Sequence, residues 1–125
     1  MRSVFLFVGS FSAFTGVAFG AFGAHALKNS FSPEMLDIYK TGVSYQMWHA
    51  LGLFGLAFLQ QQAPFSRLIH WAGWLMFGGI ILFSGSLYLL TILNAKWLGM
   101  ITPFGGLAFL AAWVLVMLFA AQKSS

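Results

Sequence analysis

Four long apolar stretches, separated by short polar segments, dominate the pattern of this chain. They cover residues of about 3–24, 43–62, 68–93 and 103–121. Each stretch is close to the ~20 residues that a helix needs to cross the hydrocarbon core of a membrane. The period-2 alternation of a half-buried strand is absent, and helices satisfy their own backbone hydrogen bonds in lipid. The pattern therefore predicts an all-α protein, an integral membrane four-helix bundle that forms a single membrane domain over residues 1–125.

The three prolines support these boundaries, because all of them fall between apolar stretches. Pro33 follows Ser32 and Pro103 follows Thr102. A hydroxyl N-cap followed by proline is typical of a helix start, since the missing N–H of proline costs nothing there. From Pro33 a helix can continue directly into the second apolar stretch.

The first stretch has an alternative interpretation as a cleaved signal peptide. Arg2 provides a basic start, and residues 24–26 (AHA) have the small–x–small form of a cleavage site. The stretch is longer than the ~7–15 apolar residues of such a peptide, so we expect the helix to be retained. Small residues recur in it every four positions, at Ser12, Gly16, Gly20 and Ala24. This stripe predicts a surface against which another helix packs closely.

The composition agrees with a membrane environment. Hydrophobic residues make up 60% of the chain and charged residues only 6%, whereas a soluble domain has about 25% charged residues. The formal net charge of +4 does not indicate nucleic acid, because the six basic residues are scattered singly at the edges of apolar stretches. The absence of cysteine excludes disulfides and thiolate metal sites. Membrane lipid is the expected partner.

With four spans both termini lie on the same side of the membrane. The basic residues then divide equally between the two sides, as Arg2, Arg67 and Lys123 against Lys28, Lys40 and Lys96. The positive-inside rule therefore does not decide the orientation. We expect both termini to lie in the cytoplasm.

Polar side chains gather, by this topology, at the membrane face that carries the first and third loops. Within them His49 lies about six residues, or ~9 Å, inside the second stretch. Tyr45 and Gln46 share its helix face. A polar residue at that depth usually faces the bundle interior. The candidate polar cluster comprises His25, Lys28, Tyr45, Gln46, His49, Ser84, Ser86, Tyr88 and Thr102.

We interpret this cluster as one buried hydrogen-bond network that ties the helices together. Two alternatives give it a function. His25 and His49 are candidate axial ligands of a haem, with a quinone as a related possibility. A small transporter or channel could use histidine as a proton carrier, although Glu34 and Asp37 both lie outside the spans. No motif indicates catalysis, a metal or a cofactor. We expect a non-enzymatic structural or accessory protein that self-associates.

Four segments together carry a family resemblance. They are residues 21–27 (AFGAHAL), 45–51 (YQMWHAL), 83–88 (FSGSLY) and 98–106 (LGMITPFGG). In this order they resemble the domain of unknown function 423 family of small bacterial membrane proteins, which is similar to eukaryotic transmembrane protein 256. The resemblance implies a multi-pass protein of the bacterial cytoplasmic membrane with a retained first helix, and it supplies no catalytic or binding residue.

Overall fold

The computed structural model describes residues 3–122, and within them every regular element is a helix. Arg2 and Lys123, which entered the charge count, lie outside these residues. The elements in chain order are α1 (Val4–Phe22), η1 (Gly23–Leu27), α2 (Pro33–Gln62), α3 (Arg67–Gly79), η2 (Ile80–Ser84), α4 (Gly85–Leu93), η3 (Lys96–Met100) and α5 (Thr102–Ala121). The turns η1 and η2 are π-helical, and η3 is a 3-10 helix. Because η1 continues α1 and η2 joins α3 to α4, the chain forms four long helical segments.

Serine hydroxyls begin three of these segments. Ser3, Ser32 and Ser66 each accept a hydrogen bond from the backbone N–H three residues further on, which satisfies one free donor of the first turn. The predicted start at Pro33 is confirmed. The predicted cap at Thr102 is wrong, since Thr102 lies inside the first turn of α5 and its hydroxyl contacts another helix. At the other end of α4, Asn94 adopts φ 53°, the left-handed conformation common after a helix.

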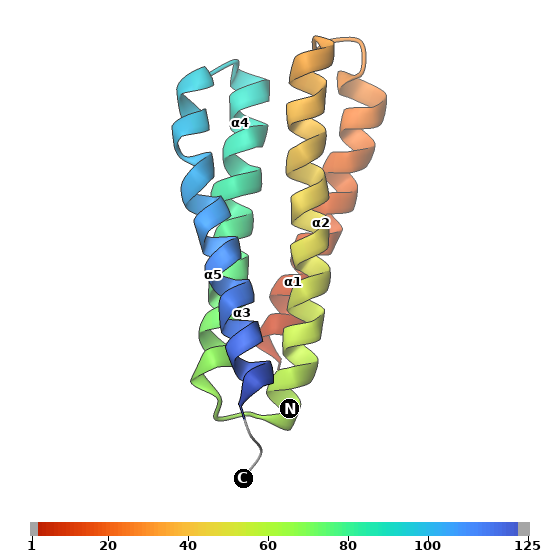
Figure 1. The fold of residues 1–125 in the computed structure, drawn as a ribbon. Coiled ribbons are helices and arrows are strands. Elements are labelled where there is room, and N and C mark those ends of the chain that lie inside the picture. The colour runs from red at the N-terminus through yellow and green to blue at the C-terminus, as the bar shows by residue number, and fades with distance from the viewer. Residues whose placement is uncertain (1–2, 123–125) are drawn as a thin grey trace.

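The helices are arranged as two antiparallel hairpins that lie side by side (Figure 1). One hairpin consists of α1 and α2, and the other of α3–α4 and α5. The two meet along α2, which packs against α3, η2 and α4, so α1 and α5 lie on the outside. Figure 1 shows the start of α1 and the end of α5 beside the turn between α2 and α3, while the other two connections lie at the opposite end. The predicted antiparallel order of four segments is confirmed.

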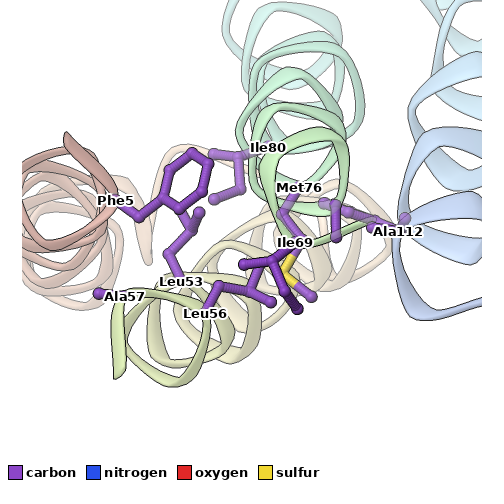
Figure 2. Packing of buried hydrophobic residues seen from close by; sticks show 10 residues of the cluster. Phe5, Leu53, Leu56, Ala57, Ile69, Met76, Ile80 and Ala112 are labelled. Atoms are coloured by element: carbon purple, nitrogen blue, oxygen red, sulfur yellow. The ribbon is translucent and has the colours of Figure 1, made fainter. Parts of the chain in front are cut away.

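The apolar core occupies the half of the bundle that carries the termini. Phe5, Leu53, Met76 and Ile80 are buried and converge from α1, α2, α3 and η2 (Figure 2). Phe5 reaches furthest, because its ring packs directly on the backbone of Gly73, where a Cβ would clash. This contact ties the outer helix α1 to α3. Toward the other end of the bundle buried polar side chains occur beside buried apolar ones.

Three segments are long and apolar enough to cross a membrane, namely Val4–Leu27, Arg67–Leu93 and Lys96–Ala121. They correspond to the first, third and fourth predicted spans. The α2 helix is long enough but less apolar, because it contains Gln46 and His49, and both of these side chains are buried. The apolar stretch from residue 43 lies within this helix, which begins at Pro33 as predicted.

The stripe of small residues on α1 packs against α2. Ser12 and Gly16 are buried, and a Cβ on Gly16 would meet the sulfur of Met47. Close approach of this kind is what small residues permit between helices in lipid. The contact opens toward the end of the stripe, where Gly20 is half-buried and Ala24 is exposed.

Candidate functional site

Gln46 lies at the centre of a hydrogen-bond network that joins three helices. Its Nε2 donates to the carbonyl oxygen of Ser12 at 2.8 Å and to the hydroxyl of Thr15 at 2.7 Å, both on α1. On the opposite side, the hydroxyl of Tyr88 on α4 donates to Gln46 Oε1 at 2.6 Å. Gln46 is 3% exposed. Both amide N–H groups and the amide oxygen are therefore bonded to the protein itself.

His49 forms a second set of contacts, between α2 and α5. The indole Nε1 of Trp113 lies 3.0 Å from His49 Nε2. An indole N–H can only donate, so Nε2 accepts, and the ring proton is on Nδ1. His49 Nδ1 then donates to the carbonyl oxygen of Tyr45 at 2.8 Å. The ring also stacks on Phe109, with centroids 3.6 Å apart. The imidazole is thus neutral and has both nitrogens engaged.

Two serines near the π-helical turn η2 form further contacts between helices. Ser84 donates to the carbonyl oxygen of Gly42 at 2.6 Å, which links η2 to α2. The hydroxyls of Ser86 and Thr102 are 2.6 Å apart and link α4 to α5. Gly105 sits directly on the backbone of Phe83 in the same turn, without room for a Cβ. The turn therefore lies where α5 approaches most closely.

Tyr39 connects the first turns of α2 to the end of α1. Its hydroxyl donates to the carbonyl oxygen of Phe19 at 2.6 Å. The ring is buried and lies 5.3 Å from that of Tyr88, measured between centroids. Through Tyr88 this contact adjoins the Gln46 network.

Gln46 and His49 lie in the middle of the bundle rather than at the face that bears the first and third loops. Measured from Pro33, where α2 begins, they lie about 20 and 24 Å along the helix at 1.5 Å per residue. The ~9 Å expected for His49 is its depth within the apolar stretch that starts at residue 43, and it stays a prediction.

The nine predicted cluster residues separate into several groups. Gln46 and Tyr88 are bonded to each other, and Ser86 is bonded to Thr102. His49 contacts α5, Ser84 contacts α2, and Tyr45 is half-buried with its ring 4.5 Å from that of Phe83. His25 and Lys28 are exposed at η1 and the turn after it. In residues 3–122 no hydrogen bond joins the Gln46 and His49 sets, so the expectation of one continuous network is wrong.

The haem interpretation does not fit this geometry. Gly23 faces Tyr39 and Gly9 faces Leu53 across the α1–α2 contact. His25 therefore lies about twelve residues of helix, or ~18 Å, from the level of His49. Two axial ligands must approach one iron from opposite sides, which this separation does not allow. His49 Nε2 is moreover already occupied by Trp113.

Four residues of these contacts were missed by sequence reasoning: Ser12, Thr15, Tyr39 and Trp113. Ser12 was placed in the small-residue stripe, although its position on the same face as Thr15 is visible as an i, i+3 pair. Trp113 carried no signal, because tryptophan in a membrane segment usually indicates the interface. Its pairing with His49 depends on how α5 crosses α2.

The fold and these contacts define the class of protein. Over residues 3–122 it is an all-helical protein with segments that are able to cross a membrane. Its buried polar side chains bond to backbone carbonyls and to one another, except the hydroxyl of Ser12, which has no partner in this part of the chain. A family described as "Protein of unknown function (DUF423)" matches residues 19–106. No solved structure gives a significant match.

Curated relatives extend this match to nearly the whole chain. The UPF0382 membrane protein YwdK of Bacillus subtilis is 45% identical over 95% of this chain and 97% of its own length. A UPF0382 membrane protein of Staphylococcus epidermidis is 41% identical over 96% of both chains. That of Staphylococcus saprophyticus is 38% identical over 92% of this chain and 94% of its own. The chain belongs to the DUF423 family and is a membrane protein, which confirms the resemblance found in its motifs.

Proposed function

We propose that this protein is a non-enzymatic structural or accessory protein of the bacterial cytoplasmic membrane, which crosses it as a four-helix bundle. The observation that carries this proposal is the use of the buried polar groups. Gln46 and His49 direct every side-chain nitrogen and oxygen to other parts of the chain. Such groups lock neighbouring helices in one arrangement, and every N–H donor of these two side chains is already used.

The surface of α2 supports its role as the remaining span. Its polar side chains Gln46 and His49 are buried, whereas Trp48, Leu51 and Phe58 are exposed. Polar residues within membrane spans face the bundle interior, and apolar ones face lipid. Over residues 43–59 the polar groups of α2 therefore face inward and its exposed side chains are apolar, while its exposed polar residues lie near its two ends.

Tryptophans at both ends support the same arrangement. Trp71 and Trp74 are exposed near the start of α3, and Trp97 is exposed on η3 at the opposite end. Tryptophan is enriched at the two membrane–water interfaces. The bundle accordingly spans the bilayer with its termini on one side, which we propose to be the cytoplasm. Self-association of the bundle stays a prediction, which chemical crosslinking in native membranes checks.

The proposed role is tested by two measurements. One identifies any compound that co-purifies with the protein, and the other measures flux across vesicle membranes that contain it. We expect a preparation in mild detergent to show no visible absorption band and no stoichiometric quinone by mass spectrometry. Proteoliposomes should show no ion or solute flux above that of empty vesicles. A chromophore that is lost in His49→Ala but retained in His70→Ala would overturn the proposal. Flux that depends on His49 would do the same.

A further inference from the structure

The small-residue stripe of α1 leaves a groove where it separates from α2. A hollow of about 260 Å³ is lined by Gly20 and Ala24 on one side and by Tyr39, Lys40 and Val43 on the other. A second hollow of about 250 Å³ includes Lys28 and Leu36. The two share Gly23, Ala24 and Lys40 in their linings. They form one continuous depression, which we call the Lys28–Lys40 groove.

The wall of this groove is fixed by Tyr39. Its ring lies against Gly23, and its hydroxyl donates to the carbonyl oxygen of Phe19 at 2.6 Å. The opposite wall has only the small side chains of Gly20, Gly23 and Ala24. The depression therefore has walls of small and rigid groups along Gly20, Gly23 and Tyr39, against which an acyl chain can pack.

The charge of the groove is entirely positive. Lys28 and Lys40 line it, and neither of the two carboxylates of the chain does so. Glu34 instead lines a separate hollow between α2 and α4, which also includes Lys96. At this end of the bundle one hollow thus contains both signs of charge, while the Lys28–Lys40 groove contains two cations.

We propose that the Lys28–Lys40 groove binds one anionic phospholipid. The ammonium groups of Lys28 and Lys40 hold the phosphate at the membrane edge, and one acyl chain lies along Gly20 and Val43. Basic residues at the headgroup level attract anionic lipids in this way. The inference rests on the proposed bundle that spans the membrane, because only that arrangement brings the end of η1 to the headgroups.

The test compares lipids that share acyl chains and differ in headgroup charge. Delipidated protein in mild detergent is mixed with phosphatidylglycerol or phosphatidylcholine, and bound lipid is counted by native mass spectrometry. We expect one phosphatidylglycerol per chain. Each basic residue at such a site should contribute about fivefold in affinity, so Lys28→Gln and Lys40→Gln should each weaken binding about fivefold. Lys96→Gln removes the same charge at the same end and should leave binding unchanged.

A further variant separates the groove from a charged surface. Ala24→Leu keeps both lysines and fills the exposed part of the depression, so it should abolish the bound lipid while thermal stability without lipid stays near wild type. Equal binding of the two lipids, or equal loss in Lys96→Gln, would overturn the proposal. Full competition by glycerol phosphate would identify a free phosphate site, and dimers that Ala24→Leu dissociates would identify a protein interface. The proposed function fails on flux or a chromophore, so the two failures are distinguishable.

Discussion

At Gln46 a single amide side chain connects α2 to both α1 and α4. A hydrogen bond between membrane helices contributes only about 0.6 kcal/mol on average. Gln46 makes three such bonds, and two of its partners are also bonded to each other, since the hydroxyl of Thr15 donates to the carbonyl oxygen of Ser12 at 3.3 Å. Loss of Gln46 would leave the hydroxyl of Tyr88 buried without its acceptor. The stabilisation therefore belongs to the set and not to any one bond.

We predict energetic coupling between Gln46 and Tyr88. In a double-mutant cycle of Gln46→Leu and Tyr88→Phe, the unfolding free energies should be non-additive by at least ~0.5 kcal/mol, as is usual for residues in contact. Both substitutions keep the approximate volume of the side chain and remove the hydrogen bond at 2.6 Å. The control is the cycle of His49→Ala and Tyr88→Phe, which belong to separate sets and should be additive. Equal coupling in the two cycles would contradict this division.

The indole of Trp113 should stabilise the protein through its N–H group. Trp113→Phe removes the donor to His49 Nε2 and leaves a buried acceptor unpaired, which costs about 1 kcal/mol or more. We expect a lower melting temperature in detergent. Trp48→Phe is the matched control, because Trp48 is 59% exposed and its indole makes no hydrogen bond among the described contacts. If the two variants have the same melting temperature, the N–H group of Trp113 does not contribute to stability.

Among the elements, α5 and η2 approach so closely that Gly105 leaves no room for a larger residue. A Cβ on Gly105 would meet backbone atoms of Phe83, whereas a Cβ on Gly106 would make only ordinary contact at 3.9 Å. Backbone atoms cannot relieve the clash by a change of rotamer, as a side chain can. We expect Gly105→Ala to destabilise the protein by ~1–3 kcal/mol, the range of overpacked cores. Gly106→Ala should be nearly neutral in the same unfolding measurement, and the reverse order would refute this packing.

The contact between α1 and α2 permits a related test of the small-residue stripe. Gly16→Leu places a long side chain against Met47 and Gln46 and should separate the helices. We therefore expect a large loss of thermal stability in detergent. Phe7→Leu changes a side chain that is 72% exposed and should have little effect. If Gly16→Leu is as stable as Phe7→Leu, the small-residue stripe does not contribute to the packing of α1 on α2.

The elements also show what sequence can predict here and what it cannot. The apolar stretches located all four helical segments, because lipid-compatible length and proline position are local properties. The π-helical turns at Gly23–Leu27 and Ile80–Ser84 had no such signal. For the polar contacts, the burial of the side chains could be predicted but their partners could not. Burial of Gln46 and His49 follows from their depth, but the choice of Thr15, Tyr88 or Trp113 as partner depends on the rotation and crossing of whole helices.

For the whole molecule, the unequal ends of the bundle explain how one chain combines rigidity with a lipid-facing surface. The apolar core stabilises the half of the bundle that contains the start of α1 and the end of α5. Toward the first and third loops, hydrogen bonds between helices contribute to the stability as well. The hairpins meet mainly along α2, so each outer helix presents most of its side chains outward. Phe14 on α1 is 74% exposed and Leu107 on α5 is 62% exposed. Such surfaces are stable in lipid and would aggregate in water.

The topology of the whole molecule can be tested with cysteine probes. Native cysteine is absent, so single cysteines are clean probes for an impermeant thiol reagent. Phe65→Cys lies in the turn beside both termini, whereas Asn29→Cys and Asn94→Cys lie in the connections at the opposite end. We expect Phe65→Cys to react from one side of the membrane and the other two from the opposite side. Labelling of all three from the same side would refute the four-span arrangement.

The same cysteine probes measure the orientation of the bundle, that is, which of its ends faces the cytoplasm. Because basic residues divide three against three, a change of one charge should bias insertion. Lys96→Gln removes a cation from the loop end and should increase the fraction with Phe65→Cys in the cytoplasm. Arg67→Gln removes one from the terminal end and should decrease it. If neither substitution changes the labelling ratio, the orientation is set by something other than flanking charge, and the expected cytoplasmic termini would need a different physical basis.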